Sequence, residues 1–212
     1  LLFLHSASGD PLADLFSAGR DWLDEPAASG ALVEPILLLC PKCPDSHYWL
    51  LRGNSWADEG GRWITDHRGY CFWVSEPADE MVEALVGLID HVAGRFPVDK
   101  RRLFLSGASM GGYACWELIR RRPGLFCAVA PVASHLDPRI TLEEFVAAVR
   151  NVPVWAFHGR GDMCCPFEDI EALVKRVGHR AWFTTYNEGR DGLSIHNSGA
   201  SVAYLDSGLA LL

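Results

Sequence analysis

The 212-residue sequence lacks long apolar runs, an initial Met and an excess of positive charge. No stretch approaches the roughly 18 consecutive apolar residues of a membrane-spanning helix, so stable membrane insertion is not expected. The formal net charge of -8, from 19 Lys and Arg against 27 Asp and Glu, argues against a nucleic-acid partner. The chain opens in an apolar segment without a basic leader, so we expect its natural N-terminus to be missing, and no targeting signal is readable.

Cysteine pairs of the kind that build disulfide or metal sites are also scarce. The seven cysteines are an odd number, and we expect Cys115 and Cys127 to lie in the core. Cys40 and Cys43 have the spacing of a redox or zinc motif, but no second pair with that spacing follows, so neither a metal nor another cofactor is predicted. A chain of this size and apolar content needs no disulfide framework, and a reducing, cytoplasmic location is favoured.

Apolar, β-rich runs alternate with amphipathic segments along the chain. The pattern predicts strands at residues 1–4, 35–40, 103–106, 126–131, 152–157 and 181–186. It predicts helices at residues 11–23, 77–92, 113–122, 141–149, 167–177 and 202–212. Continuous apolar strands between amphipathic helices predict one α/β domain over residues 1–212, with a mostly parallel sheet covered by helices on both faces.

Residues 44–75, the tryptophan-rich segment, depart from this alternation. They are long for a connection and contain Trp49, Trp56, Trp63 and Trp73, which are half of the eight tryptophans. Long irregular segments often act as lids or binding loops, which would give the substrate an apolar or aromatic face. The segment could equally form a small core that packs it onto the sheet, and both interpretations stay open because tryptophan serves both uses.

A Gly-x-Ser-x-Gly stretch stands where a predicted strand passes into a predicted helix, with Ser109 at its centre between Gly107 and Gly111. A nucleophilic serine in this setting sits on a sharp, strained turn, and its neighbours must be small because the chain packs closely there. The helix that begins at Met110 would direct free N–H groups towards the negative charge of an attacked carbonyl. The pattern therefore predicts that Ser109 is a nucleophile.

A serine nucleophile needs a base, and the base needs an acid that orients it. Asp162 follows the fifth predicted strand and His196 follows the sixth, so both would lie at the carboxyl edge of the sheet. Their order after Ser109 is the one expected for a strand–elbow–helix hydrolase. Asp137 is the rival acid because it follows the fourth predicted strand at the same edge, and His158 is expected to make structural hydrogen bonds.

The sequence resembles the α/β-hydrolase superfamily, and within it the phospholipase/carboxylesterase and predicted-peptidase (feruloyl-esterase-like) branch. The matching stretches are LFLH, CPKCP, VDKRRLFLSGASMGGYACWEL, PGLFCAVAPVAS, VPVWAFHGRGDMCCP and IHNS. The resemblance implies a carboxylesterase-like serine hydrolase that cleaves small-molecule esters or thioesters through Ser109, His196 and Asp162 and an acyl-enzyme intermediate. It also implies that the first two strands of the family sheet are missing upstream of Leu1, which would leave residues 35–40 as an edge strand.

The resemblance also assigns the residues around the reacting carbonyl. Backbone N–H groups of Met110 and of Ser6 or Ala7 would hold the oxyanion, and His5 and Trp49 would contact the substrate. Relatives usually have glycine where this chain has Ser6, so we expect the extra side chain to restrict the acyl group to small or slender ones. The alternative function is a non-catalytic relative that binds a small ligand. A complete triad in the expected order favours the enzyme.

Overall fold

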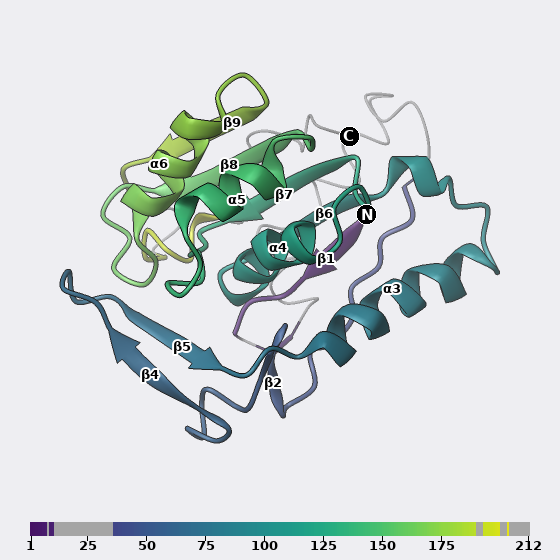
Figure 1. Cartoon of the computed structure of the whole chain (residues 1–212). Coiled ribbons are helices and arrows are strands. Elements are labelled where there is room, and N and C mark those ends of the chain that lie inside the picture. Colours follow the sequence, from purple (N-terminus) through teal and green to yellow (C-terminus); the bar gives the residue numbers. More distant parts are fainter. Residues whose placement is uncertain (8, 11–35, 190–192, 200–202, 204–212) are drawn as a thin grey trace.

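Five parallel strands form the central sheet of the computed structural model, which describes residues 1–7, 9–10, 36–189, 193–199 and 203 (Figure 1). The strand order is β1-β6-β7-β8-β9. The strands are β1 (Leu2–Leu4), β6 (Phe104–Ala108), β7 (Ala128–Val132), β8 (Val154–Gly159) and β9 (Ala181–Tyr186). Each overlaps a predicted strand, so the predicted parallel α/β sheet is confirmed.

The strand predicted at residues 35–40 is wrong in extent. Within the described residues 36–40, only Leu39 forms a parallel bridge, to Leu2, and it lies in hydrogen-bond contact with the backbone of Leu1 and Phe3. Pro41 follows directly and has no N–H to continue such a ladder. The Leu1 amino group also donates to the Leu37 carbonyl at 2.8 Å, but the segment does not extend the sheet by a full strand.

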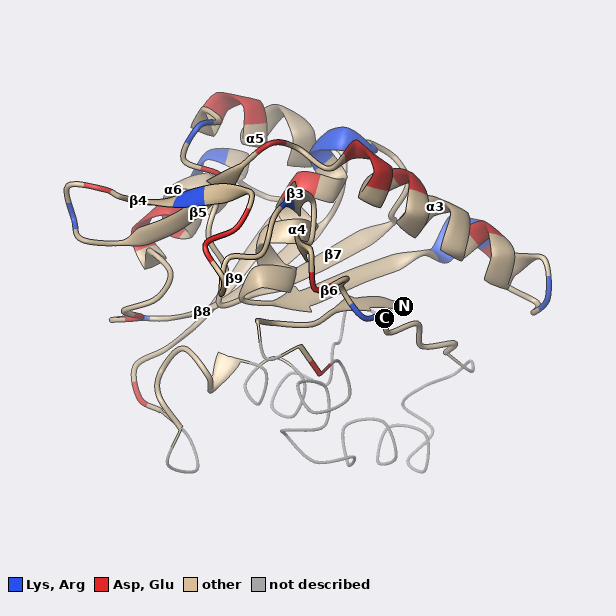
Figure 2. Cartoon of the chain, turned by 90° about the horizontal axis from the view of Figure 1, so that it is seen from below, with Lys and Arg blue, Asp and Glu red and all other residues tan. Residues whose placement is uncertain are grey.

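The described helices lie on one side of the sheet, as Figure 2 shows. They are α3 (Asp79–Ala93), α4 (Met110–Arg121), α5 (Leu142–Val149) and α6 (Phe167–Val177), with a short 3-10 turn at Lys100–Arg102. The helices predicted at residues 11–23 and 202–212 fall outside the described residues, except for residue 203. Those two helices, and the single domain over residues 1–212, therefore stay predictions.

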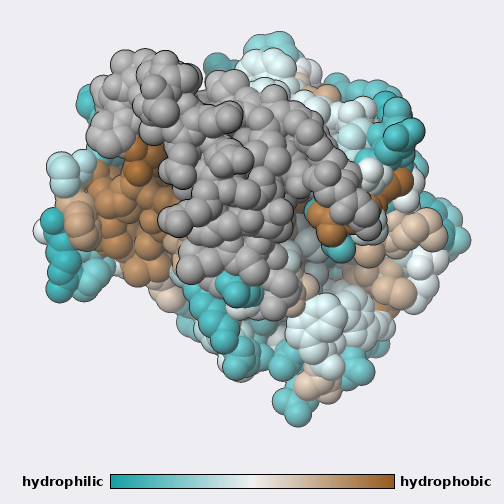
Figure 3. All heavy atoms as spheres, turned by 180° about the vertical axis from the view of Figure 1, so that it is seen from behind, coloured by the Kyte–Doolittle hydropathy of each residue, from teal (hydrophilic) through white to brown (hydrophobic). Residues whose placement is uncertain are grey.

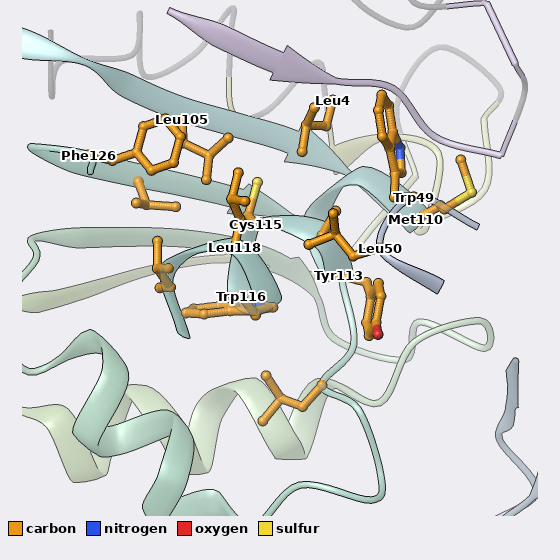
Figure 4. Close-up of a cluster of buried hydrophobic side chains, with 14 of the residues drawn as sticks. Leu4, Trp49, Leu50, Leu105, Met110, Tyr113, Cys115, Trp116, Leu118 and Phe126 are labelled. Carbon is orange, nitrogen blue, oxygen red and sulfur yellow. The ribbon is translucent and has the colours of Figure 1, made fainter. Parts of the chain in front are cut away.

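The core gathers around α4, whose side chains are buried on almost every side. Figure 4 shows Cys115, Trp116 and Leu118 of this helix beside Leu105 of β6 and Phe126. Cys115 is fully buried as predicted, whereas Cys127 is only half-buried. A central helix of this kind fixes the position of its first residue, Met110, and of the turn that precedes it.

One charged side chain lies inside this core. Glu117 of α4 has no exposed surface, and its carboxylate pairs with Arg120 at 2.8 Å and Arg121 at 3.0 Å. A buried carboxylate is tolerated only when it is paired in this way. The other charged residues in Figure 2 lie mainly on helices and loops, and the central strands β6 and β7 carry none.

The tryptophan-rich segment forms two small antiparallel sheets. One pairs β2 (His47–Tyr48) with β3 (Leu51–Arg52), and the other pairs β4 (Gly61–Thr65) with β5 (Cys71–Ser75). Figure 1 shows the β4–β5 hairpin extending beyond the main sheet. Its ends are tied back through the antiparallel bridge of Leu51 with Pro77.

The four tryptophans of this segment divide into two pairs. Trp49 and Trp73 are buried, with 0% and 1% of their surface exposed, and both belong to the main hydrophobic core, so they pack the segment onto the sheet. Trp56 and Trp63 are 68% and 41% exposed. Their indole rings are open to solvent, as the lid or binding-loop interpretation requires.

The surface carries further apolar side chains, and no described helix is both long and apolar enough to cross a membrane. Figure 3 shows brown, apolar areas on the face seen from behind. The large exposed apolar residues of the described chain include Leu37, Phe96 and Trp182. The brown area at the left of Figure 3 is a continuous patch.

Candidate active site

Ser109 occupies the turn between β6 and α4 in a backbone conformation that non-glycine residues rarely adopt. Its φ of 53° and ψ of -112° lie in a sparsely populated region. Its N–H donates to the carbonyl of Val132 at 2.9 Å, which holds the turn against β7. Strain that is held in place by surrounding structure is typical of functional sites.

The flanking glycines are required by close approach of the chain. A Cβ at Gly111 would lie 1.9 Å from the carbonyl oxygen of Leu4, and one at Gly107 would lie 2.6 Å from the carbonyl oxygen of Gly111. The end of β1 therefore passes directly against the first turn of α4. This contact brings the loop after β1 next to Ser109.

Ser109, His196 and Asp162 lie in one hydrogen-bonded row. The Nε2 atom of His196 is 3.0 Å from the Ser109 Oγ, and its Nδ1 atom is 2.8 Å from the Asp162 Oδ2. The three residues follow β6, β8 and β9, whose carboxyl ends meet at one edge of the sheet. The structure thus brings together the three side chains that the sequence singled out.

The surroundings of Asp162 keep its carboxylate ionised. Burial alone would raise the pKa of Asp162, but contacts with His158 and His196 and the N–H of Cys165 outweigh it and hold that pKa well below its usual range. The N–H groups of Cys164 and Cys165 donate to Oδ1 at 2.7 and 3.0 Å. A buried carboxylate with this many donors is a fixed negative charge beside the His196 ring.

His158 and the rival acid Asp137 have structural partners. The His158 Nε2 lies 3.2 Å from the carbonyl oxygen of Cys165 and 3.3 Å from Asp162. Asp137 accepts from Arg139 at 2.7 and 2.9 Å, and these bonds lower its pKa although burial opposes them. Arg139 also donates to the Ser75 carbonyl at 2.6 Å, so this ion pair fastens the end of β5.

The loop after β1 reaches the site as the resemblance implied, but the assignment of His5 and Trp49 to the substrate is wrong. Ser6 and Ala7 line the cavity in front of Ser109, whereas His5 and Trp49 have 1% and 0% exposed surface and lie outside its wall. A side chain without exposed surface offers nothing to a substrate. His5 and Trp49 therefore support the loop from below.

Their hydrogen bonds show how this support works. The N–H of Cys43 donates to the His5 Nε2 at 2.8 Å, so the ring proton belongs on Nδ1 and donates to the Ser6 carbonyl at 2.6 Å. The Trp49 indole N–H donates to the His5 carbonyl at 2.9 Å. These bonds fix the backbone of residues 5 and 6 from both sides. Across the site, Met110 is the first residue of α4, so its N–H has no acceptor within the helix.

A cavity of about 820 Å³ opens in front of Ser109 and His196. Its walls come from the sheet, the loops after β8 and β9, and the tryptophan-rich segment. The described lining includes Tyr48, Trp56, Trp63, Gly69, Cys71, Val132, Ala133, His135, Met163, Cys164, Leu193 and Asn197. Exposed Trp56, Trp63, Met163 and Leu193 thus line the same cavity. This size and composition suit a small, largely apolar ligand.

Sequence reasoning missed the contacts that hold the tryptophan-rich segment over the cavity. The Tyr70 hydroxyl donates to the carbonyl of Asp162 at 3.1 Å, and Arg68 makes a two-pronged pair with Asp169 of α6 at 2.7 and 2.9 Å. The Asp66-x-x-Gly69 pattern signals the turn that carries both side chains. Their partners lie about a hundred residues further along, where no local pattern could indicate them.

Comparison with known proteins gives structural relatives only. No protein-family model matches the chain, and no curated protein matches its sequence. A thermostable esterase is similar at a TM-score of 0.69 and 24% identity, covering 94% of this chain, which spans 49% of that structure. SOBER1 of Arabidopsis thaliana is similar at a TM-score of 0.58 and 19% identity, and the match covers 100% of this chain and 98% of SOBER1.

A third similar structure is that of a fluorophosphonate-binding serine hydrolase, FphF of Staphylococcus aureus. It has a TM-score of 0.58 and 15% identity, covering 99% of this chain and 80% of its own. The chain therefore has the α/β-hydrolase fold that these esterases and hydrolases share. Because the identities are low, the likeness establishes the fold, and the activity must be argued from the site.

Proposed function

We propose that this protein is a serine hydrolase that cleaves carboxylic ester or thioester bonds through an acyl-enzyme intermediate. The observation that carries the proposal is the row of hydrogen bonds from Asp162 through His196 to Ser109, with Ser109 on a strained turn at the mouth of a cavity. The esterases with the same fold support this reaction class. A fold without this row of side chains would not support it.

The proposed chemistry follows from where the protons lie on Asp162, His196 and Ser109. The ionised Asp162 accepts the Nδ1 proton of His196, so Nε2 carries a lone pair towards Ser109. His196 takes the serine proton as Oγ attacks the carbonyl, and it returns that proton to the leaving group. Water then attacks the acyl-enzyme, with His196 again as the base, and the acid product leaves.

The attacked carbonyl oxygen gains negative charge, so hydrogen-bond donors must face it. We assign this role to the backbone N–H of Met110 and to that of Ser6 or Ala7, because α4 begins at Met110 and the other two residues line the cavity. One such donor contributes about 3–4 kcal/mol to the transition state. The hydrogen bond from the Trp49 indole to the His5 carbonyl holds the loop of residues 5 and 6 in place beside Ser109.

The substrate class is a small or slender acyl ester. Ser6 lies in the cavity wall at a position where glycine would leave more room. We expect Ser6→Gly to widen the acyl range, so that the ratio of kcat/KM for bulky and short esters rises. An unchanged ratio would show that Ser6 does not limit the acyl group.

Turnover of a series of chromogenic esters with increasing acyl length tests the proposal. A burst of leaving group equal to the enzyme concentration should precede the steady state when deacylation is slow, and Ser109→Ala should abolish both phases. Ser46→Ala, which removes an exposed serine hydroxyl away from the cavity, is the matched control and should keep full activity. Absence of turnover with every ester would favour the non-catalytic, ligand-binding alternative.

A further inference from the structure

Three side chains of different metal-binding chemistry meet beside Ser109. Asp162, Cys164 and His196 each offer one ligand atom, and these atoms all lie within 4.8 Å of one another. They present an oxygen, a sulfur and a nitrogen, which is the mixed donor set that zinc accepts. Within the described part of the chain, this group is the one in which three such ligands come together.

We propose that Cys164, His196 and Asp162 form an inhibitory zinc site, and that an ion bound there stops hydrolysis. The inhibitory part of this proposal rests on the proposed function, whereas the binding part does not. Tetrahedral zinc has bonds of about 2.0–2.3 Å, so its ligand atoms lie about 3.3–3.6 Å apart. Closing a separation of up to 4.8 Å to that spacing takes a movement of at most about 1.5 Å.

Cys164 is the ligand that can make this movement. Its backbone N–H is held to the Asp162 carboxylate at 2.7 Å, which keeps the residue beside the acid, while its side chain is exposed and lines the cavity. Rotation about its Cα–Cβ bond moves the sulfur without disturbing that hydrogen bond. Water from the open cavity supplies the fourth ligand.

The neighbouring thiols do not fit the same role. Cys165 and Cys71 also line the cavity, but Cys165 is only 4% exposed and neither thiol is among the three grouped ligands. Binding at Cys164 converts its thiol to a thiolate bound to zinc and releases the proton to solvent. The step involves no change of oxidation state, so it needs no other reactant.

Inhibition follows because both ring nitrogens of His196 are already in use. Nδ1 is bound to Asp162 and Nε2 to Ser109, so a bond from His196 to the metal displaces one of these partners. A metal bond at Nδ1 displaces the Asp162 contact and moves the Nδ1 proton to Nε2, so the ring loses its orientation and can no longer accept the serine proton. Loss of the Ser109 contact removes the lone pair that accepts the serine proton.

Zinc titration of ester hydrolysis is the first test, with each variant compared with its own metal-free rate. Wild-type protein should lose activity as Zn²⁺ is added and regain it with a chelator. Cys164→Ser should raise the Zn²⁺ concentration for half-inhibition by at least about tenfold. The matched control Cys71→Ser, in the same cavity, should keep the wild-type Zn²⁺ concentration for half-inhibition, measured against its own metal-free rate. Equal sensitivity of wild type and Cys164→Ser would overturn the proposal.

A binding measurement that needs no activity is the second test. Co²⁺ added to Ser109→Ala should produce a thiolate-to-cobalt absorption band that Zn²⁺ removes, and the double variant Ser109→Ala/Cys164→Ser should show none. A missing band in Ser109→Ala overturns the metal site, whether or not the protein hydrolyses esters. A band in a protein that hydrolyses no ester would leave the metal site standing and contradict the proposed function alone.

Discussion

The parallel sheet with α4 and the tryptophan-rich segment meet at one cavity but are built in different ways. The sheet and α4 hold Ser109 and Asp162 through close backbone packing and buried hydrogen bonds. The tryptophan-rich segment is two short hairpins. Buried side chains such as Trp49 and Trp73 join it to the main core, and side-chain contacts of Tyr70, Arg68 and Arg139 fasten its outer hairpin. The first region carries the proposed chemistry, and the second shapes the space around the substrate.

This difference separates two kinds of expected effect. Changes in the row of side chains on the sheet should lower kcat with every ester, because they remove interactions made in the transition state. Changes on the cavity side of the tryptophan-rich segment should alter KM and selectivity among esters. A residue of the tryptophan-rich segment that proved essential for kcat with all esters, without any loss of folding, would contradict this division between the two regions.

The largest effect is expected for Asp162→Asn. Asparagine keeps the shape of the side chain but favours the His196 tautomer with its proton on Nε2, and kcat should fall by about 10⁴. Asp137→Asn is the matched control, because its carboxylate pairs with Arg139 and its loss should weaken the attachment of β5 and leave most of the turnover. Steady-state kinetics on folded variants decide the assignment. A crippled Asp137→Asn beside an active Asp162→Asn would reverse the two roles.

Trp49→Ala tests whether part of the tryptophan-rich segment serves the sheet. Removing this buried ring and its bond to His5 should lower the free energy of unfolding by about 3–5 kcal/mol. Trp56→Ala removes a ring that is 68% exposed, so stability should change by less than about 0.5 kcal/mol while KM for aromatic esters rises. Urea denaturation and kinetics of both variants measure the contrast. Equal stability losses would contradict it.

Gly111→Ala tests the close contact between β1 and α4. The added methyl would lie 1.9 Å from the Leu4 carbonyl oxygen, so the variant should lose about 3 kcal/mol of stability. Gly87→Ala on the exposed side of α3 meets no atom within 4 Å and should gain up to about 1 kcal/mol. Thermal melts of the two variants should shift in opposite directions. A stable Gly111→Ala would mean that the contact is looser than described.

The smallest effect is expected at the tip of the β4–β5 hairpin. Tyr70→Phe removes one hydrogen bond to the Asp162 carbonyl, worth about 1 kcal/mol, so kcat/KM should fall by no more than about fivefold. The fall should differ between short and bulky esters, because the hairpin forms one wall of the cavity. Arg62→Ala, on the exposed side of the same hairpin, is the control and should have no effect. A much larger loss in Tyr70→Phe would give the hairpin a direct part in the chemistry.

The sequence predicts the sheet and its central turn well, because their signals are local. The apolar run before Ser109, the flanking glycines and the amphipathic run after it identify β6, the turn and α4 from one continuous stretch. The helix begins at Met110, where the turn after Ser109 predicts it, although the amphipathic period alone starts only at residue 113 because Gly111 and Gly112 add no apolar side chain. Asp162 and His196 could be chosen because each follows a recognisable strand.

The tryptophan-rich segment could not be predicted in the same way. Nothing in the local sequence separates the buried Trp49 and Trp73 from the exposed Trp56 and Trp63, since burial here depends on how two hairpins fold back on the sheet. The residue pairs that anchor it join distant parts of the chain. The wrong assignment of His5 and Trp49 to the substrate has the same origin, because a residue near a site in sequence can lie behind its wall.

Labelling by a fluorophosphonate probe, followed by peptide mapping, tests the central claim most directly. Such a probe forms a stable bond with an activated serine, so it reports the nucleophile without any assumption about the natural substrate. The account predicts a single adduct on Ser109, lost in Ser109→Ala and strongly slowed in Asp162→Asn. A protein that stays unlabelled, or that carries the adduct on another residue, would contradict the assignment of Ser109 as the nucleophile.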